Sequence, residues 1–300
     1  MTKPHQTPEI TTLAAGRATA EIAPAAGARL MRWNIGGRPV LHWPAGADWA
    51  EAARIRGGNP VLFPFIARTF LDGRIGHWRG PDGKERPAPM HGLVRAAAFD
   101  TEQPDPSRLV MKIVSDEAMA EAFPFPFVFG VEYVLTEDSL SVVFTVENAG
   151  KEPMPFSVGN HFYFEVPAAG REDWVMECPR RRWVRQEKDG TIVAAAPPPQ
   201  DCPLADPSLV DLMHVGPPRE GVVLRHRGDG RRVMFDFPPD AAGSNPWFCV
   251  TTWTETPQSD FYCVEPWTAL PDAVHNKQGL RWLKPRGRET LRLRMTTAGW

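Results

Sequence analysis

Apolar and polar residues alternate with a period of two in several segments, and this pattern constrains the fold more than any other feature of the sequence. In residues 140–147, Leu140, Val142, Phe144 and Val146 are each followed by a residue of the opposite face. Residues 291–295 repeat the pattern with leucine, methionine and arginine. Because side chains of a strand point alternately to its two faces, the pattern predicts half-buried β-strands.

Turn residues separate these segments at short intervals. The chain of 300 residues contains 32 Pro and 25 Gly, which leaves little room for long helices, while its 42% of hydrophobic residues is enough for a core. We expect hairpins around residues 36–37, 137–139 and 228–230, further strands at 156–166, 247–254 and 261–265, and one short helix at 48–55. The sequence therefore predicts an all-β protein, a large antiparallel β-sandwich whose single domain spans residues 1–300.

Charge and composition exclude several classes of protein. The 34 Lys and Arg nearly balance the 36 Asp and Glu, so we expect no nucleic-acid partner. No run of 18 apolar residues and no signal-peptide pattern occurs, so we expect no membrane partner and a cytoplasmic location. The four cysteines lie at positions 178, 202, 249 and 263 without metal-ligand spacing, and we expect four buried, reduced thiols. The sequence does not indicate whether the protein is a monomer or a homodimer.

Four segments interrupt the alternation and place titratable residues beside turns and aromatic side chains. They are residues 56–65 (RGGNPVLFPF), 90–95 (MHGLVR), 159–164 (GNHFYF) and 263–267 (CVEPW). None of them contains the G-x-G-x-x-G pattern or the phosphate loop that an oxidoreductase or nucleotide enzyme would use. Taken singly, each is a weak signal, because a lone His on an apolar strand is usually a hydrogen-bonded core residue.

In this order, the four segments resemble the aldose 1-epimerase (galactose mutarotase-like) family. The resemblance rests on Gly58 to Pro64, His91 to Leu93, His161 to Phe164 and Cys263 to Pro266, and the stretch from Glu265 to Asp272 is similar to its bacterial branch. It implies a galactose mutarotase-like β-supersandwich without metal or organic cofactor. It also implies an isomerase that interconverts the α and β anomers of an aldose or an aldose phosphate.

The resemblance assigns roles to particular residues. Glu265 would be the general base at the C1 hydroxyl and His161 the general acid at the ring oxygen, while His91 would orient charge there. Asp211 would bind sugar hydroxyls, with Asp236 as the alternative, and Arg68 matches the family's sugar-binding arginine. The pair suits ring opening, because one base and one acid suffice and histidine exchanges protons near neutral pH.

The substrate remains open between a free aldose and a 6-phosphate. Arg56 and Arg95 lie where the glucose-6-phosphate 1-epimerase branch carries phosphate-binding arginines, but they could instead pair with carboxylates such as Glu51 or Asp100. Trp267 stands where that branch usually has Gly, which favours a free aldose. Among the aromatic residues, we expect Trp78, Phe162 and Trp267 at the sugar-binding cleft.

Two other function classes compete with the epimerase. A non-catalytic carbohydrate-binding protein could use the same fold, although it would not need an acid and a base. A glycoside hydrolase needs two carboxylates about 5–10 Å apart across the bond it cleaves, whereas only Glu265 stands in a motif of catalytic character.

Overall fold

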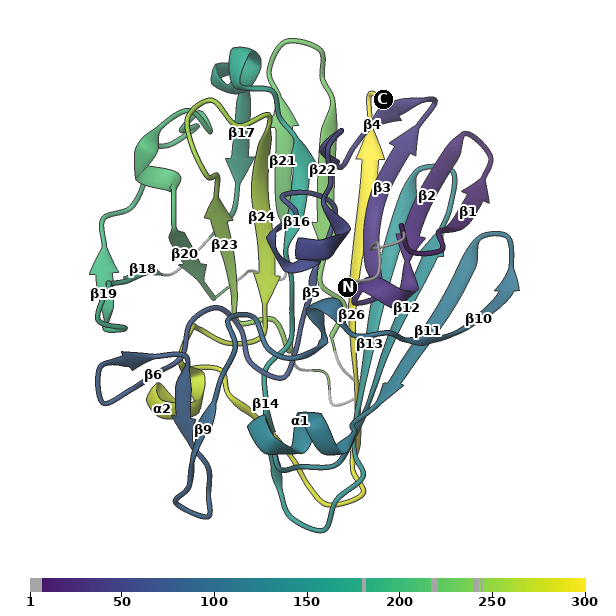
Figure 1. Ribbon diagram of the computed structural model, residues 1–300. Helices are drawn as coiled ribbons and strands as arrows, with labels where there is room; N and C mark the ends of the chain where they lie inside the picture. The colour runs from purple at the N-terminus through teal and green to yellow at the C-terminus, as the bar shows by residue number, and fades with distance from the viewer. Residues whose placement is uncertain (1–6, 180–181, 217–220, 240–242, 244) are drawn as a thin grey trace.

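The computed structural model describes residues 7–179, 182–216, 221–239, 243 and 245–300 (Figure 1). Within these residues, antiparallel sheets form most of the regular structure, and the predicted all-β fold is confirmed. Two sheets are large and carry the architecture; we call them the first and the second sheet. In this part of the chain, no helix is both long enough and apolar enough to cross a bilayer.

The first sheet contains the longest strands. Its order is β10-β11-β12-β13-β26-β22-β21-β17. The strands are β10 (Asp100–Asp105), β11 (Arg108–Val114), β12 (Phe127–Leu135), β13 (Ser139–Asn148), β26 (Arg288–Ala298), β22 (Arg232–Asp236), β21 (Val222–His226) and β17 (Trp174–Glu177). Both hairpins predicted within it, around 137–139 and 228–230, are present.

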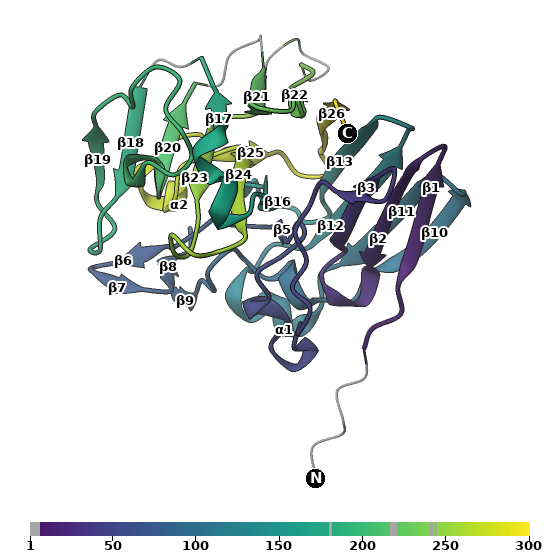
Figure 2. The same ribbon diagram turned by 90° about the horizontal axis from the view of Figure 1, so that it is seen from above.

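The second sheet has the order β19-β18-β20-β23-β24-β15-β5, and β16 also pairs with β24. Its strands are β19 (Ile192–Ala195), β18 (Arg182–Gln186), β20 (Leu212–Val215), β23 (Cys249–Trp253), β24 (Phe261–Trp267), β15 (Gly159–Asn160), β16 (Phe162–Glu165) and β5 (Val61–Leu62). In Figure 2 this sheet lies on one side of the molecule and β10 to β13 lie on the other.

Smaller elements complete the described fold. A four-stranded sheet contains β1 (Thr11–Ala15), β2 (Ala18–Ala23), β3 (Arg29–Ile35) and β4 (Arg38–Pro39). Three strand pairs are β6 (Phe70–Leu71) with β7 (Arg74–Ile75), β8 (His77–Arg79) with β9 (Glu85–Pro87), and β14 (Met154–Phe156) with β25 (Arg281–Leu283). The α-helices are α1 (Glu117–Ala122) and α2 (Ala273–Asn276), and 3-10 helices occupy Pro24–Ala26, Trp49–Arg54, Val94–Ala96, Ala168–Asp173 and Pro207–Leu209.

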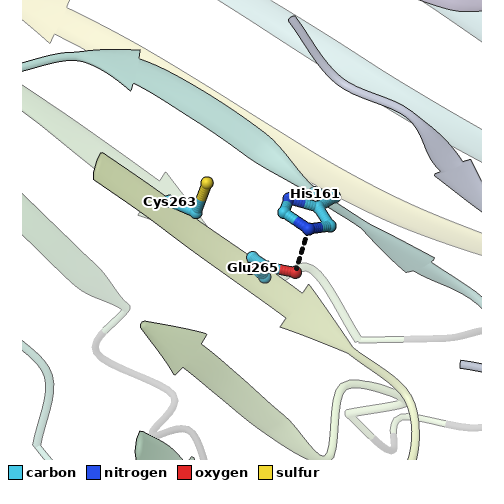
Figure 3. Close-up of side chains that lie close together, drawn as sticks. All are labelled: His161, Cys263 and Glu265. Carbon is cyan, nitrogen blue, oxygen red and sulfur yellow. Dashed lines mark ion pairs between the residues drawn. The ribbon is translucent and has the colours of Figure 1, made fainter. Parts of the chain in front are cut away.

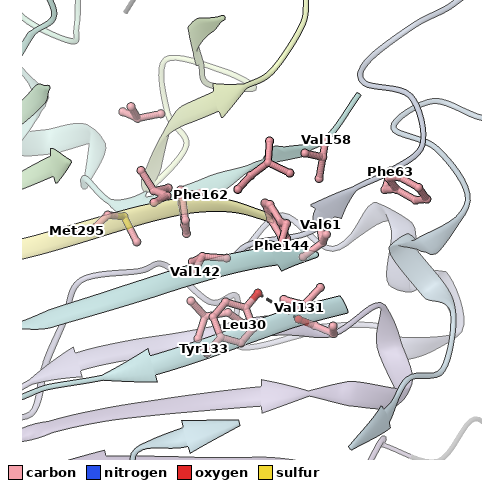
Figure 4. Close-up of a cluster of buried hydrophobic side chains, with 14 of the residues drawn as sticks. Leu30, Val61, Phe63, Val131, Tyr133, Val142, Phe144, Val158, Phe162 and Met295 are labelled. Carbon is pink, nitrogen blue, oxygen red and sulfur yellow. Dashed lines mark hydrogen bonds between the residues drawn. The ribbon is translucent and has the colours of Figure 1, made fainter. Parts of the chain in front are cut away.

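The hydrophobic core lies where the inner faces of the sheets meet. Val142 and Phe144 from β13 and Met295 from β26 are fully buried there together with Phe162 from β16 (Figure 4). Alternation decides which residues take part: on β24, Tyr262 and Val264 face this core, while Cys263, Glu265 and Trp267 belong to the opposite face. That opposite face of the second sheet carries the candidate site.

Three predictions of local structure need correction or refinement. The continuous strand expected at 156–166 is divided among three short strands, because the chain changes partners: β14 pairs with β25, β15 with β5 and β24, and β16 with β24. The helix expected at 48–55 is a 3-10 helix, in which Asp48 accepts a hydrogen bond from the Ala50 N–H. The strand expected after residues 36–37 is only β4, two residues long.

All four cysteines lie among the described residues, are buried and form no disulfide, as predicted. Cys249 and Cys263 lie on the paired strands β23 and β24, but Cys249 is opposite Trp267 and Cys263 is opposite Trp253. The two thiols are therefore separated by four positions along the ladder.

Candidate active site

The register of the second sheet aligns four polar or sulfur-containing side chains in one row. Met213 on β20 pairs with Thr251 on β23, and Thr251 pairs with Glu265 on β24. On the other side of β24, Phe162 pairs with Val264, so His161, the residue before Phe162, lies beside Glu265. Side chains directly opposite each other on one face are close neighbours. The sheet thus brings together residues that are 104 positions apart in sequence, the separation of 161 and 265.

His161 and Glu265 are in direct contact. Nε2 of His161 lies 3.4 Å from Oε2 of Glu265 (Figure 3), and the exposed fractions of the two residues are 8% and 2%. Oε2 of Glu265 and Nδ1 of His161 have no hydrogen-bond partner among the described residues. The sulfur of Cys263 lies in the same group, whose three ligand-type atoms are all within 4.8 Å of one another. In the described chain, this is the group of residues that could hold a metal ion.

Asn59 fixes the backbone that carries His161. Its Oδ1 accepts a hydrogen bond of 2.8 Å from the His161 N–H, and its Nδ2 donates one of 2.9 Å to Oδ1 of Asn160. Asn59 is fully buried. It follows Gly58, which has a positive φ of 69° and where an added Cβ would lie 2.1 Å from the carbonyl oxygen of Leu30. Only glycine can come this close to the Leu30 carbonyl at a positive φ, and this backbone conformation places Asn59 next to His161.

His91 is held by a reciprocal pair of hydrogen bonds with Ala67. The His91 N–H donates to the Ala67 carbonyl at 3.0 Å, and the Ala67 N–H donates to Nδ1 of His91 at 3.3 Å. Both residues have positive φ, 66° and 53°, an uncommon conformation that is often found at functional sites. Because Nδ1 accepts, the proton of the neutral ring is on Nε2, so His91 is a hydrogen-bond donor. Its ring centre lies 5.3 Å from that of His161.

Burial shifts the acid–base properties of all three residues. Burial, and next the negative charge of Asp211, raise the pKa of Glu265 well above its ordinary value. Burial lowers the pKa of His161 well below its ordinary value, and nearby His91 and Arg95 lower it further. The pKa of His91 is also lowered, first by burial and then by Arg95. Strongly shifted groups that meet in a cavity are typical of catalytic sites.

A cavity of about 180 Å³ opens over this row. Arg68, after β5, and Asp211, before β20, lie on its wall. No described residue accepts a hydrogen bond from the Arg68 side chain, and its charge acts on the Asp211 carboxylate. The cavity is smaller than the roughly 300–1,000 Å³ typical of pockets for drug-sized ligands, and it suits one small ring. Its lining is Arg56, Ala67, Arg68, Met90, His91, His161, Gln186, Asp211, Met213, Thr251, Trp253, Glu265, Trp267 and Pro271.

The two arginines considered for phosphate binding are both engaged. Nη2 of Arg56 lies 2.9 Å from a carboxylate oxygen of Glu255, and the guanidinium stands over the Trp253 ring. Arg56 lines the cavity, whereas Arg95 does not, because Arg95 donates to the backbone carbonyls of Met90 and Ala53. Neither arginine therefore pairs with Glu51 or Asp100, the carboxylates considered from the sequence. Arg56 pairs with Glu255, and Arg95 pairs with backbone carbonyls.

Two of the three aromatic residues expected at the cleft lie elsewhere. Phe162 belongs to the core between the sheets, because it has the opposite parity to His161 on the same stretch (Figure 4). Trp78 on β8 is buried against Phe65 and donates its indole N–H to the Ala122 carbonyl. Trp267 does line the cavity. Asp236, the alternative to Asp211, is exposed on β22 of the first sheet and does not line it.

Several residues of the site were not predicted from the sequence. Tyr163 stacks on His161 with ring centres 4.7 Å apart, and Trp253 meets His161 edge-on at 5.8 Å. The alternation rule could have identified Tyr163, two residues after His161 on the same face, and Trp253, two residues after Thr251. Asn59 was in a recognised motif, but only the folded chain shows that it contacts His161.

Comparisons with known proteins agree with this architecture. Residues 9–285 match the family model of aldose 1-epimerase. The Slr1438 protein from Synechocystis sp. PCC 6803 has a TM-score of 0.81 at 20% identity, covering 100% of this chain and 99% of that one. A galactose mutarotase-like protein from Lactobacillus casei gives 0.79 at 22%, covering 97% and 100%. The GalM/aldose epimerase homologue from C. elegans gives 0.76 at 13%, covering 98% and 99%. At these identities, the structural likeness concerns the fold. No curated protein matches the sequence significantly.

Proposed function

Because the chain belongs to the aldose 1-epimerase family, we propose that it interconverts the α and β anomers of a free hexose by acid–base ring opening and closure. The observation that carries the proposal is the buried contact between His161 and Glu265 on the wall of a cavity of one-ring size. In the reaction, the two oxygens that exchange protons, the C1 hydroxyl and the ring oxygen, are attached to the same carbon. A base and an acid only a few ångströms apart can therefore reach both.

In the opening step, Glu265 takes the proton of the C1 hydroxyl, the bond from C1 to the ring oxygen breaks, and the ring oxygen takes a proton from His161. The open-chain aldehyde then rotates about its C1–C2 bond. On closure the former ring hydroxyl attacks the other face of C1, returning its proton to His161 while the aldehyde oxygen takes one from Glu265. Atoms and charges balance over the cycle. Positioned acid–base groups of this kind contribute about 10²–10⁴-fold in rate.

The shifted pKa values determine how strongly the two groups act in these roles once the shared proton lies on His161. A carboxylate whose pKa is raised by burial is a stronger base than an exposed one, and an imidazolium whose pKa is lowered is a stronger acid. His91 presents its Nε2–H as a donor and supports developing charge near the ring oxygen. Arg68 and Asp211, on the wall of the same cavity, supply a donor and an acceptor for sugar hydroxyls.

A free hexose is favoured over a 6-phosphate because the Arg56 guanidinium is paired with Glu255 and Arg95 is turned toward backbone carbonyls. One observation favours a hexose 6-phosphate as the second candidate: Arg56 and Arg68 both line the cavity, and guanidinium groups bind phosphate well.

We further propose that residues 1–300 form one domain, since the sheets share a core. Four buried thiols that form no disulfide fit a reducing cytoplasm.

The test follows the optical rotation of freshly dissolved α-D-glucose and α-D-galactose, and anomer exchange of glucose 6-phosphate by NMR, with the same protein. We expect acceleration of the free sugars and a rate lower by at least tenfold for the phosphate. Glu265→Gln should lower the rate by about 10²–10⁴-fold. The matched control is Glu165→Gln, since Glu165 lies on β16 but pairs with His42 and does not line the cavity.

Sugar binding without acceleration would favour the non-catalytic carbohydrate-binding protein over the epimerase. If glucose 6-phosphate reacts faster than either free sugar, the substrate is a hexose 6-phosphate and not a free hexose. A full rate in Glu265→Gln would remove Glu265 from the role of base.

A further inference from the structure

We propose that His161, Cys263 and Glu265 form a binding site for a zinc-like divalent cation, and that occupation of this site blocks the acid–base pair. The blocking depends on the proposed function, whereas the binding does not. The three ligand-type atoms lie within 4.8 Å of one another, and all three residues are buried (Figure 3). In this proposal the cation is an inhibitor, not a cofactor.

The sheet register makes the three residues converge. Cys263 and Glu265 are two positions apart on β24, so both side chains point to the same face. His161 immediately precedes the neighbouring strand β16, and its side chain lies on the same face. Tyr163, which pairs with Cys263, stacks on the His161 ring and covers the group. Each ligand is thus on or beside a strand of the sheet, and such elements hold sites more precisely than loops do.

The distances fit a small cation after a modest adjustment. Zn²⁺ binds N, O and S ligands at about 2.0–2.3 Å, so tetrahedral ligand atoms stand about 3.3–3.8 Å from one another. The His161 Nε2 and Glu265 Oε2 atoms are 3.4 Å apart, within that interval. The sulfur of Cys263 lies within 4.8 Å of the other two atoms, so it must approach them by at most about an ångström, which a side-chain rotation can supply.

Charge also favours a divalent cation of this type. On binding, the Cys263 thiol and any protonated Glu265 carboxyl release their protons to solvent, so that thiolate, carboxylate and neutral imidazole together carry two negative charges. A divalent cation neutralises them, and a neutral complex avoids the cost of a buried charge. One thiolate, one imidazole and one carboxylate suit Zn²⁺ rather than Mg²⁺ or Ca²⁺, which prefer oxygen ligands. The fourth position faces the cavity, because His161 and Glu265 line it.

The experiment uses Co²⁺ as a spectroscopic probe on the intact protein, because a Co²⁺–thiolate bond gives a charge-transfer band in the near ultraviolet. We expect one equivalent of Co²⁺ to produce this band and Zn²⁺ to displace it. Cys263→Ser should abolish the band and weaken Zn²⁺ binding at least tenfold. Cys202→Ser is the matched control, since Cys202 lines a separate cavity together with Cys178 and His214, and that variant should keep the band. Zn²⁺ affinity should fall as pH falls, because protons compete for the ligands.

The outcomes separate this inference from the proposed function. If Co²⁺ gives no thiolate band, or if the band survives Cys263→Ser in a variant with native circular dichroism, the cation site is refuted, whatever the rate of anomer exchange. If the band behaves as expected while no sugar is turned over, the site stands and the epimerase proposal fails. Where both hold, Zn²⁺ should inhibit anomer exchange, and inhibition that persists in Cys263→Ser would overturn the proposed mode of blocking.

Discussion

Replacing Asn59 with alanine removes a buried side chain that ties the backbone N–H of His161 to the rest of the site. The change deletes two hydrogen bonds, from the His161 N–H at 2.8 Å and to Asn160 Oδ1 at 2.9 Å. Both partner groups are buried, and each unsatisfied buried group costs about 1–3 kcal/mol. We therefore expect the free energy of unfolding to fall by about 2–6 kcal/mol, toward the lower end if a water occupies the vacated space.

Catalysis should suffer separately from stability. Without its anchor, the His161 backbone is free to shift, and a misplacement of about 1 Å can cost about 10²-fold in rate. We expect kcat for anomer exchange to fall by about 10–100-fold while KM changes little, because Arg68 and Asp211, the proposed sugar-binding groups, are untouched. Polarimetry at several sugar concentrations gives both constants, and urea unfolding gives the stability.

Asn148→Ala is the matched control for this substitution. Asn148 is also fully buried; its amide donates to the carbonyls of Glu152 and Leu283, and its Oδ1 accepts from the Gly150 N–H. It lies at the end of β13 and does not line the cavity. Asn148→Ala should lose comparable stability and keep its kcat. An Asn59→Ala protein with unchanged kcat, or an equal loss of kcat in both variants, would refute the positioning role.

Three further predictions concern neighbouring residues. Phe162→Ala should lower the free energy of unfolding by about 3–5 kcal/mol and leave KM unchanged. A raised KM in a folded variant would show that the Phe162 ring contacts the sugar. Arg68→Met should raise KM for the sugar at least tenfold with little change in stability, and an unchanged KM would remove Arg68 from sugar binding. Glu265→Gln should be more stable than the wild type at pH 8 but not at pH 4. The sign follows because the folded-state pKa of Glu265 is raised, so wild-type stability is lost as the pH rises from the unfolded to the folded pKa. Urea midpoints of the two proteins at both pH values check this, and equal midpoints at pH 8 would contradict it.

The sequence predicts the fold class and many strands because alternation is a local property of each segment. The hairpin between β21 and β22 is an example, since its strands and its turn lie within fifteen residues. The shortness of β4 was less predictable, because a hydrogen bond to a distant segment decides it: the N–H of His42 donates to the Tyr163 carbonyl instead of extending β4. Local pattern cannot indicate such a partner.

The site was predictable where motif residues carry the chemistry, and not where the fold chooses partners. His91, His161, Asp211 and Glu265 do line one cavity. The partner of Arg56, however, is Glu255, which lies 199 residues away, and no spacing in the sequence points to it. Phe162 was misplaced for another reason: it was assigned to the cleft because it is next to His161 in sequence, whereas alternation along the chain turns consecutive side chains to opposite faces.

Burial shifts the pKa values of His161 and Glu265, and it also requires that the backbone carrying these two residues be held rigidly. Taking one carboxyl and one imidazole out of water raises the pKa of the first and lowers that of the second, so burial favours the uncharged pair, in which a single proton lies on the carboxyl. Anomer exchange needs that one-proton state in both directions, since each half-reaction takes a proton at one oxygen and gives one at the other. A dry pair is stable only if its backbone is fixed by other contacts, and those contacts are the β23–β24 ladder, the Asn59 amide and the reciprocal bonds of His91 with Ala67. Loosening any of them should admit water, move both pKa values toward their ordinary values and lower the rate.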